Sequence, residues 1–522
     1  MKKRKSVALA LCLVLASTSL YGCGKNSSST ATTTDGKGEK KTVSVMTFDF
    51  SSSGGAMTGE NAQKVIDYVE DYTNTNLEFQ FVPSDSYEDK LSLTLASGSD
   101  MPMIITVGSF SANIVNNARA GAFWDLSKYI YDSEKYPNLS RANKSVNESI
   151  SVDGKLYGVY RARALGRYGF GYRADWAEKL GISKPETIED FYNMLYAFTY
   201  NDPDGNGVDD TYGLNLCKYT GPLDVMQTWF GCGNGWVEKN GELVPVHMTD
   251  EYMEALEWFK KLYDDGLIAK DWAVRDTATW QNDNKNGVAG VYVDMIDGAR
   301  RIWDYYETEG IPSVMNDGTN ASMELMGGLA KEKGGEVHSL ATSGYNGFFV
   351  ITKGGAKTEE DLEACLHFLD KMCDDDMLIT TGYGLEGIHW ERGENNKYVQ
   401  LSTDLDIAKM DYDGLNQVVA YIPTSTITGL NFDVTDRVKI QNQLYADNEK
   451  DVVFNPAAAF MINSNTYTLN GANLDTIISD ARTQYIVGEI DKAGLQAAWD
   501  LWSTTGGADV IKEVNEAYKA SK

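Results

Sequence analysis

From residue 42 onward, short runs of apolar residues alternate with longer stretches in which apolar residues recur every three or four positions. The apolar runs predict β-strands, and the recurring positions predict amphipathic helices: strands over 42–48, 76–82 and 103–107, helices over 61–71 and 87–98. This alternation predicts a parallel α/β sheet. Because open α/β sheets bind ligands beyond the carboxyl ends of their strands, we expect the loops 49–55 and 108–113 to lie at a cleft.

Further along the chain, a helix is predicted over 187–198, where Thr187 and Asp190 form a capping pair. An Asp/Asn/Gly-rich loop ends this helix, and a strand is predicted at 211–216.

A helical pattern over 358–376 carries Cys365 and Cys373, which are predicted to be buried thiols. Cys217 and Cys232 either pair or remain free.

The loop after residue 201 has the spacing of a calcium-binding loop. Its oxygen donors follow the pattern D-x-[DN]-x-[DN]-G, with Gly207 at the glycine position. The predicted ligands are Asp202, Asp204, Asn206, the carbonyl of Val208, and Asp210. An EF-hand has a glutamate at position 12, whereas this chain has Gly213, so Thr211, a distant carboxylate or water would complete the shell. The alternative is a solvated turn without an ion. With no partner EF-hand helix, a bound calcium would be structural.

The first 41 residues predict export and anchoring. Residues 1–22 have the basic start and apolar centre of a signal peptide, and the cleavage region ends at Cys23. This ending resembles the lipobox of bacterial lipoproteins, which implies lipidation of Cys23; the alternative is a plain secretory peptide. Residues 23–41 lack large apolar residues and predict a flexible tether. Since no later run is apolar enough to span a membrane, we expect the lipid to be the only anchor, on the extracellular face of the cytoplasmic membrane.

The length of the chain indicates how many lobes it forms, and its charge and motifs exclude several classes of function. The body is long for one hydrophobic core, so at least two lobes are expected. The formal net charge is −28, and such a surface repels nucleic acid and anionic lipid. No sequence motif of a hydrolase, a nucleotide-binding loop or a zinc site is present. Glu386 near His389 is weak evidence for hydrolysis because carboxylates are so abundant. We therefore predict that the protein is not an enzyme.

Aromatic residues suggest what the chain binds. Its 30 tyrosines and 11 tryptophans offer flat apolar faces with polar edges, which suit sugar rings. Most of them must belong to the core, so the better candidates for ligand binding are those in loops and at strand ends. The predicted ligand-binding residues are Tyr160, Arg163, Trp229, Trp280, Asp294, Tyr345, Glu386 and Trp390.

Several segments in a fixed order resemble the extracellular solute-binding proteins of ABC importers, the broad family that contains maltose-binding protein. They are residues 90–104, 124–130, 154–159 and 172–181. The calcium-type loop and residues 383–390 are similar to the subgroup that includes alginate-binding proteins. The resemblance implies a two-lobed α/β periplasmic-binding-protein-like fold of class II, with hinge crossovers and an interlobe cleft. It places the first lobe at 42–160 and 342–395 and the second at 161–341 and 396–522.

The resulting hypothesis is a lipid-anchored receptor that delivers a carbohydrate, in particular an oligosaccharide, to the permease subunits of an ABC importer. The alternatives are a surface glycoside hydrolase, an adhesion or scaffold lipoprotein, and a receptor for peptides. Arg161, Arg163 and Arg167 either meet a carboxylate of the solute or pair with acidic residues of the chain.

Overall fold

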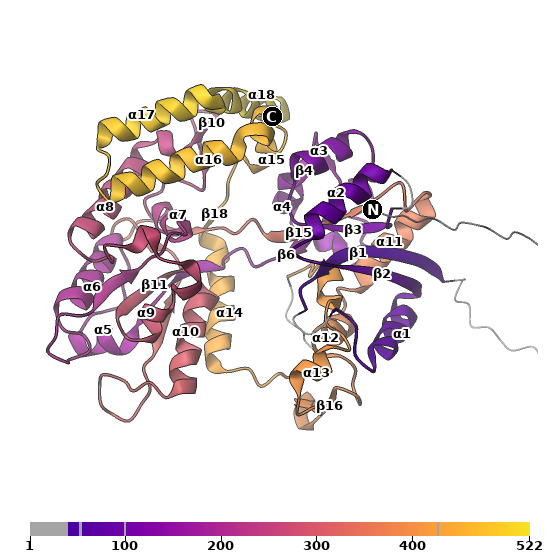
Figure 1. Ribbon diagram of the computed structural model, residues 1–522, viewed down its shortest axis with the longest axis horizontal. Coiled ribbons are helices and arrows are strands. Elements are labelled where there is room, and N and C mark those ends of the chain that lie inside the picture. The colour runs from indigo at the N-terminus through magenta and orange to yellow at the C-terminus, as the bar shows by residue number, and fades with distance from the viewer. Residues whose placement is uncertain (1–39, 52–54, 99–100, 425–426, 428) are drawn as a thin grey trace, which may run out of the picture. The chain divides into compact units, whose positions relative to one another are not determined.

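The first of two main sheets contains the strands predicted near the N-terminus. The computed structural model describes residues 40–51, 55–98, 101–424, 427 and 429–522. The strands predicted over 42–48, 76–82 and 103–107 are all present in this sheet (Figure 1). Its five strands, in spatial order, are β2 (Thr75–Pro83), β1 (Lys41–Asp49), β3 (Ile104–Val107), β15 (Tyr345–Ile351) and β6 (Gly158–Ala162).

This sheet is mixed rather than parallel. β1 is parallel to β2 and β3, whereas β15 is antiparallel to both β3 and β6. The predicted parallel arrangement is confirmed for β1, β2 and β3, whereas β15, which was not part of that prediction, runs antiparallel. The reason is the chain path: the chain leaves this sheet after β6, returns at the same edge, and so must run in the opposite direction. Tyr345, the first residue of β15, lies opposite Ala162, the last residue of β6.

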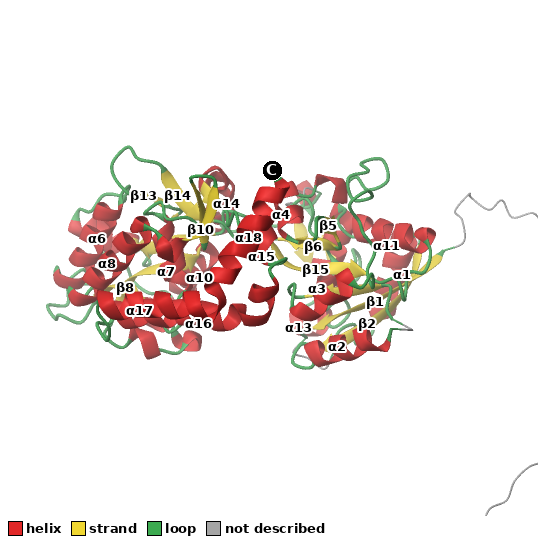
Figure 2. Cartoon of the chain, turned by 90° about the horizontal axis from the view of Figure 1, so that it is seen from above, coloured by secondary structure: helices red, strands yellow, loops and turns green. Residues whose placement is uncertain are grey.

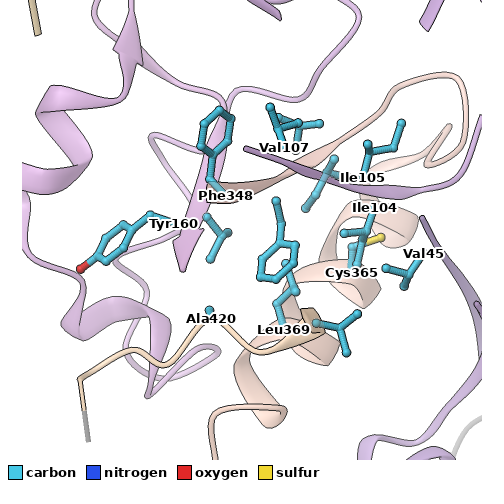
Figure 3. Packing of buried hydrophobic residues seen from close by; sticks show 14 of the residues in the cluster. Val45, Ile104, Ile105, Val107, Tyr160, Phe348, Cys365, Leu369 and Ala420 are labelled. Atoms are coloured by element: carbon cyan, nitrogen blue, oxygen red, sulfur yellow. The ribbon is translucent and has the colours of Figure 1, made fainter. Parts of the chain in front are cut away.

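The core of this sheet is built from aliphatic side chains of the strands and of the helices that cover them. Figure 3 shows Val45 and Ile104 close to Cys365 and Leu369 of α11. Leu415 and nearby residues up to Ile422 are buried in the same core, although the sequence assigns residues 396–522 to the second lobe. The helices of this region are α1 (Ala62–Thr73), α2 (Tyr87–Ser97), α3 (Ala112–Arg119), α4 (Lys144–Ser149), α11 (Glu359–Lys371), α12 (Asp375–Tyr383) and α13 (Leu405–Lys409).

A second sheet has four strands and its own core. β11 is parallel to β8 and antiparallel to β7, and β12 is antiparallel to β7. The strands are, in spatial order, β12 (Met323–Met326), β7 (Tyr168–Arg173), β11 (Ala289–Met295) and β8 (Tyr212–Asn215). Its helices are α5 (Ala174–Leu180), α6 (Ile188–Tyr200), α7 (Gly221–Thr228), α8 (Asp250–Asp264), α9 (Asn282–Lys285), α10 (Ile296–Glu309) and α14 (Asp436–Asn448). The predicted capping pair is confirmed, because Thr187 and Asp190 bond reciprocally at the start of α6.

Four helices end the chain. In Figure 2, α16 and α17 lie side by side, and α18 packs against α16. The four helices are α15 (Ala458–Met461), α16 (Asn465–Ile486), α17 (Lys492–Trp502) and α18 (Ala508–Ser521). The remaining strands form small sheets: β4 (Ser151–Val152) with β5 (Lys155–Leu156), β9 (Trp236–Lys239) with β10 (Glu242–Pro245), β13 (Leu329–Ala330) with β14 (Val337–Leu340) and β18 (Val452–Val453), and β16 (Trp390–Arg392) with β17 (Tyr398–Gln400).

The cysteines of the described residues are all free and buried. Cys217 and Cys232 do not form a disulfide bond. The helix predicted over 358–376 is interrupted: α11 ends at Lys371, and α12 begins at Asp375. Cys365 therefore lies within α11, and Cys373 lies in the turn that follows.

Candidate functional site

The ends of β1, β3 and β6 lie at one edge of the first sheet, because these three strands run in the same direction. Arg163 follows β6 directly, and its backbone N–H donates to the carbonyl of Gly344 at 2.9 Å. Tyr345, at the start of β15, is half-buried beside it. The structure thus brings together two predicted site residues, Arg163 and Tyr345, at the edge where open α/β sheets bind ligands.

Tyr160 lies on β6 but is almost fully buried. Its hydroxyl accepts a 2.7 Å hydrogen bond from the backbone N–H of Asn143. Figure 3 shows this hydroxyl pointing away from the packed aliphatic side chains. Tyr160 therefore joins the sheet to the start of α4.

Three arginines follow one another near the end of β6, and they differ in their partners. Arg167 forms two hydrogen bonds with the carboxylate of Asp297, at 2.9 and 3.0 Å. Of the two roles considered for these arginines, Arg167 therefore has that of pairing with an acidic residue of the chain. Arg161 is buried and donates to the carbonyl of Asn416 at 3.3 Å. Arg163 is half-buried and donates to the carbonyl of Ala162 at 2.8 Å.

The corresponding edge of the second sheet is lined by aromatic rings. Trp280 is buried, with its indole N–H donating to the carbonyl of Asn215 at 3.1 Å. Its ring lies 4.6 Å from Tyr292 and 6.1 Å from Tyr219, measured between ring centroids. Tyr219 is the exposed member of this group and was missed by the sequence analysis, although its place just after β8 was an available signal.

Asp294 lies near the end of β11 at the same edge. Its side chain is buried, and Oδ1 has no hydrogen-bond partner among the described residues. Burial raises the pKa of this carboxyl to about 6, and the negative charge of Asp297 adds to the effect. A buried carboxylate with an unsatisfied oxygen is costly to the fold, which is typical of groups kept for a function.

Trp229 belongs to the core of the second sheet. Its side chain has no exposed surface, and its ring lies 5.1 Å from Phe191 and 5.6 Å from Phe170. Such a side chain offers no face to a ligand unless the core opens. The ligand-binding role predicted for Trp229 therefore gains no support from its position.

Glu386 and Trp390 lie together, but away from the strand ends described above. Both line a surface cavity of about 340 Å³ beside α12, together with Tyr68 and Arg392. Trp390 is nearly buried and donates to the carbonyl of Gly384 at 3.1 Å, whereas the exposed Glu386 lies 3.5 Å from Arg392. A larger open hollow of about 640 Å³ beside α8 and the α16–α17 turn contains none of the predicted residues.

The predicted calcium loop connects α6 to β8. Asp202 accepts hydrogen bonds from the backbone N–H groups of Gly205 and Gly207, and both glycines adopt the left-handed conformation. Asp204 and Asp210 both approach the side-chain amide nitrogen of Asn206, at 2.8 Å and 3.2 Å. Thr211, a possible further ligand, instead donates to the carbonyl of Phe198 at 2.9 Å.

The carboxylates of this loop approach one another but do not form a complete metal-coordination shell. Among the described residues, no three carboxylate, imidazole or thiol side chains gather tightly enough to hold a metal ion. Burial and the neighbouring carboxylates of Asp202 and Asp210 raise the pKa of Asp204. The donor set is nevertheless of the kind that calcium takes, because the carboxylates of Asp204 and Asp210 converge on the side chain of Asn206.

Sequence comparison identifies the family. The sequence profile of the bacterial extracellular solute-binding proteins matches residues 55–321. The chain belongs to this family. Lipoprotein LipO of Bacillus subtilis (strain 168) is 39% identical over 459 residues, which cover 87% of this chain and 88% of LipO. The polygalacturonan/rhamnogalacturonan-binding protein YtcQ of the same strain is 32% identical over 463 residues, covering 88% and 89%.

Solved structures share the fold. An HMO-binding, ABC-transporter-associated solute-binding protein from Bifidobacterium longum infantis ATCC 15697 matches with a TM-score of 0.66 and 21% identity, over 93% of this chain and 99% of that one. The alginate-binding protein AlgQ2, solved without calcium ion, matches with a TM-score of 0.61 and 16% identity, over 92% and 98%. The fold is thus the two-lobed α/β fold of periplasmic binding proteins, as the resemblance implied, and the alginate-binding subgroup is among its neighbours.

The anchoring predictions concern residues that are largely outside the described part of the chain. Cys23 and the signal peptide lie there, and so does nearly all of the tether. Within the described residues, no helix has the length and apolar character needed to cross a bilayer.

Proposed function

We propose that this chain is a lipid-anchored receptor on the extracellular face of the membrane that binds an oligosaccharide and delivers it to an ABC importer. The observation that carries the proposal is that each of the two sheets has suitable side chains at the carboxyl ends of its parallel strands. The first sheet has Arg163 and Tyr345 there, and the second has Trp280, Tyr219 and Asp294. Aromatic faces beside charged and hydroxyl groups suit sugar rings. Relatives named for binding polygalacturonan and HMO support a carbohydrate as the solute.

Binding without turnover is the expected behaviour. Isothermal titration of the mature protein against a panel of neutral and acidic oligosaccharides should give saturable binding to at least one member. A reducing-sugar assay on the same samples should show no release of products. Release of reducing ends without a stable complex would overturn the receptor proposal in favour of a glycoside hydrolase, and no binding to any sugar would point to another solute class.

We further propose that Asp202, Asp204, Asn206, Asp210 and the carbonyl of Val208 hold a structural calcium ion. The convergence of Asp204 and Asp210 on one amide nitrogen supports it, because a cation there would relieve the crowding of negative charge. Calcium would supply only charge neutralisation and cross-linking between α6 and β8.

Removing calcium is therefore expected to lower the melting temperature. Adding a chelator to the protein should shift the thermal transition downward, and added calcium should restore it, because an ion that binds only the folded state stabilises it by mass action. Asp204→Ala should have the melting temperature that the wild type has in chelator, and neither chelator nor calcium should change it. The matched control is Asp317→Ala, in another exposed turn, which should still respond to calcium. A wild-type transition indifferent to chelator and calcium would leave the loop as an ordinary turn.

A further inference from the structure

Arg161 and Arg163 lie two residues apart at the end of β6, so the extended backbone directs both side chains to the same face. The exposed fraction of Arg161 is 5%, and its Nε has no hydrogen-bond partner among the described residues. Among the described residues, the hydrogen-bond acceptor of its guanidinium is a backbone carbonyl, that of Asn416. Burial, with the nearby Arg163, lowers the pKa of Arg161 to about 10. Two positive charges are thus held close together where water is scarce.

The lack of a carboxylate partner sets Arg161 apart from the other buried arginines. Of the described arginines, three are less than a tenth exposed. Arg173 pairs with Asp175 at 2.8 Å, and Arg482 pairs with Asp224 at 2.6 Å. Within the described ranges, neither Arg161 nor Arg163 has a carboxylate within 4.0 Å. A buried guanidinium normally requires an anionic partner, and the described part of the chain supplies none, although the full sequence has 75 acidic residues.

Groups suited to a sugar ring surround these arginines. The guanidinium of Arg163 lies 6.0 Å from the centre of the Tyr421 ring, and Tyr421 is half-buried. Tyr421 has a φ of 56°, a left-handed conformation that is unfavourable for a tyrosine and that often marks a functional position. Tyr345 provides a second half-buried ring at the same edge of the sheet.

We propose that Arg161 and Arg163 form a carboxylate subsite, so that the oligosaccharide bound by this chain contains uronic acid residues. The inference rests on the proposed receptor function and specifies its ligand class. A guanidinium fork matches a carboxylate with two parallel hydrogen bonds, and such charge-assisted bonds are the strong ones in a dry site. The relative named for binding polygalacturonan, a polymer in which each sugar carries a carboxyl group, agrees with this class.

The test compares trigalacturonic acid with its fully methyl-esterified form, because esterification removes the charge of each carboxyl group and adds only one methyl group in its place. The wild-type mature protein should bind the acid by calorimetry and bind the ester at least about tenfold more weakly. Arg163→Gln should lose about tenfold or more of the affinity for the acid and clearly less of the affinity for the ester, because the ester carries no charge for Arg163 to pair with. Arg163→Lys keeps the positive charge but lacks the two-pronged guanidinium group, so its affinity for the acid should lie between those of the wild type and Arg163→Gln.

Arg161→Gln should lose more affinity for the acid than Arg163→Gln does. If Arg161→Gln does not fold, because its side chain is the more buried of the two, Arg163→Gln still tests the proposal. Arg141→Gln is the matched control, because it removes the same charge from an exposed arginine and should bind both sugars like the wild type. Equal affinity for acid and ester, unchanged in Arg163→Gln, would overturn the carboxylate subsite and leave the receptor proposal intact. Failure to bind either these sugars or any neutral oligosaccharide would overturn both.

Discussion

Replacing Trp229 by alanine is expected to destabilise the protein by about 3–5 kcal/mol, the usual loss when a large aromatic side chain is removed from a core. The Trp229 side chain has no exposed surface and packs against Phe170 and Phe191. Its indole N–H has no hydrogen-bond partner among the described residues, so the loss comes from packing rather than from a broken bond. Urea denaturation, followed by tryptophan fluorescence and circular dichroism, measures the change.

The control is Trp499→Ala, because Trp499 is half-buried and lies at the rim of the same core. Its loss should be clearly smaller, since less apolar surface returns to water. The experiment also decides between the two roles considered for Trp229. A variant that unfolds at the wild-type urea concentration but no longer binds an oligosaccharide would make Trp229 a ligand-binding residue.

Replacing Asp294 by asparagine is expected to stabilise the protein at neutral pH, by about 3 kcal/mol if the whole pKa shift is removed. Burial raises the pKa of Asp294 to about 6 from 3.8, so the folded protein holds this proton more tightly than the unfolded chain does. Wild-type stability should therefore fall as the pH rises from about 4 to about 6 and stay low above that range. Asparagine carries no charge and removes this penalty.

The difference between Asp294→Asn and wild type should vanish below about pH 4, where both side chains are neutral. Asp297→Asn is the matched control with the opposite sign. Although burial opposes its charge, the hydrogen bonds from Arg167 outweigh burial and lower the pKa of Asp297 to about 2. Asp297→Asn should thus destabilise the protein at pH 7. Chemical denaturation at several pH values measures both, and a pH-independent effect of Asp294→Asn would mean that its charge is not the cause.

Stabilisation by Asp294→Asn would also bear on function. A residue that weakens the fold is retained when it is needed for binding, so the variant should lose affinity for the oligosaccharide as it gains stability. Stability gained without loss of binding would place Asp294 outside the binding site.

The local elements and the family could be predicted from the residues alone. The strands near the N-terminus, the capping pair of Thr187 and Asp190 and the oxygen donors of the 202–210 loop depend on residues that are neighbours in the chain, so their spacing was sufficient. The order of several short segments was sufficient for the resemblance that the comparisons then confirmed.

The packing of the folded chain, by contrast, was needed to know which candidate side chains face solvent and which have partners. In the sequence, Trp229 and Tyr345 both lie in non-periodic positions. In the structure, Trp229 is enclosed by aromatic rings from β7 and α6, whereas Tyr345 is the first residue of β15 at the edge of its sheet. Likewise, Arg161 and Arg167 lie in one short segment, yet of these two arginines it is Arg167 that pairs with Asp297, a residue of α10 far away in the sequence. Burial and pairing are set by residues far apart in the sequence, and no local pattern encodes which of them will meet.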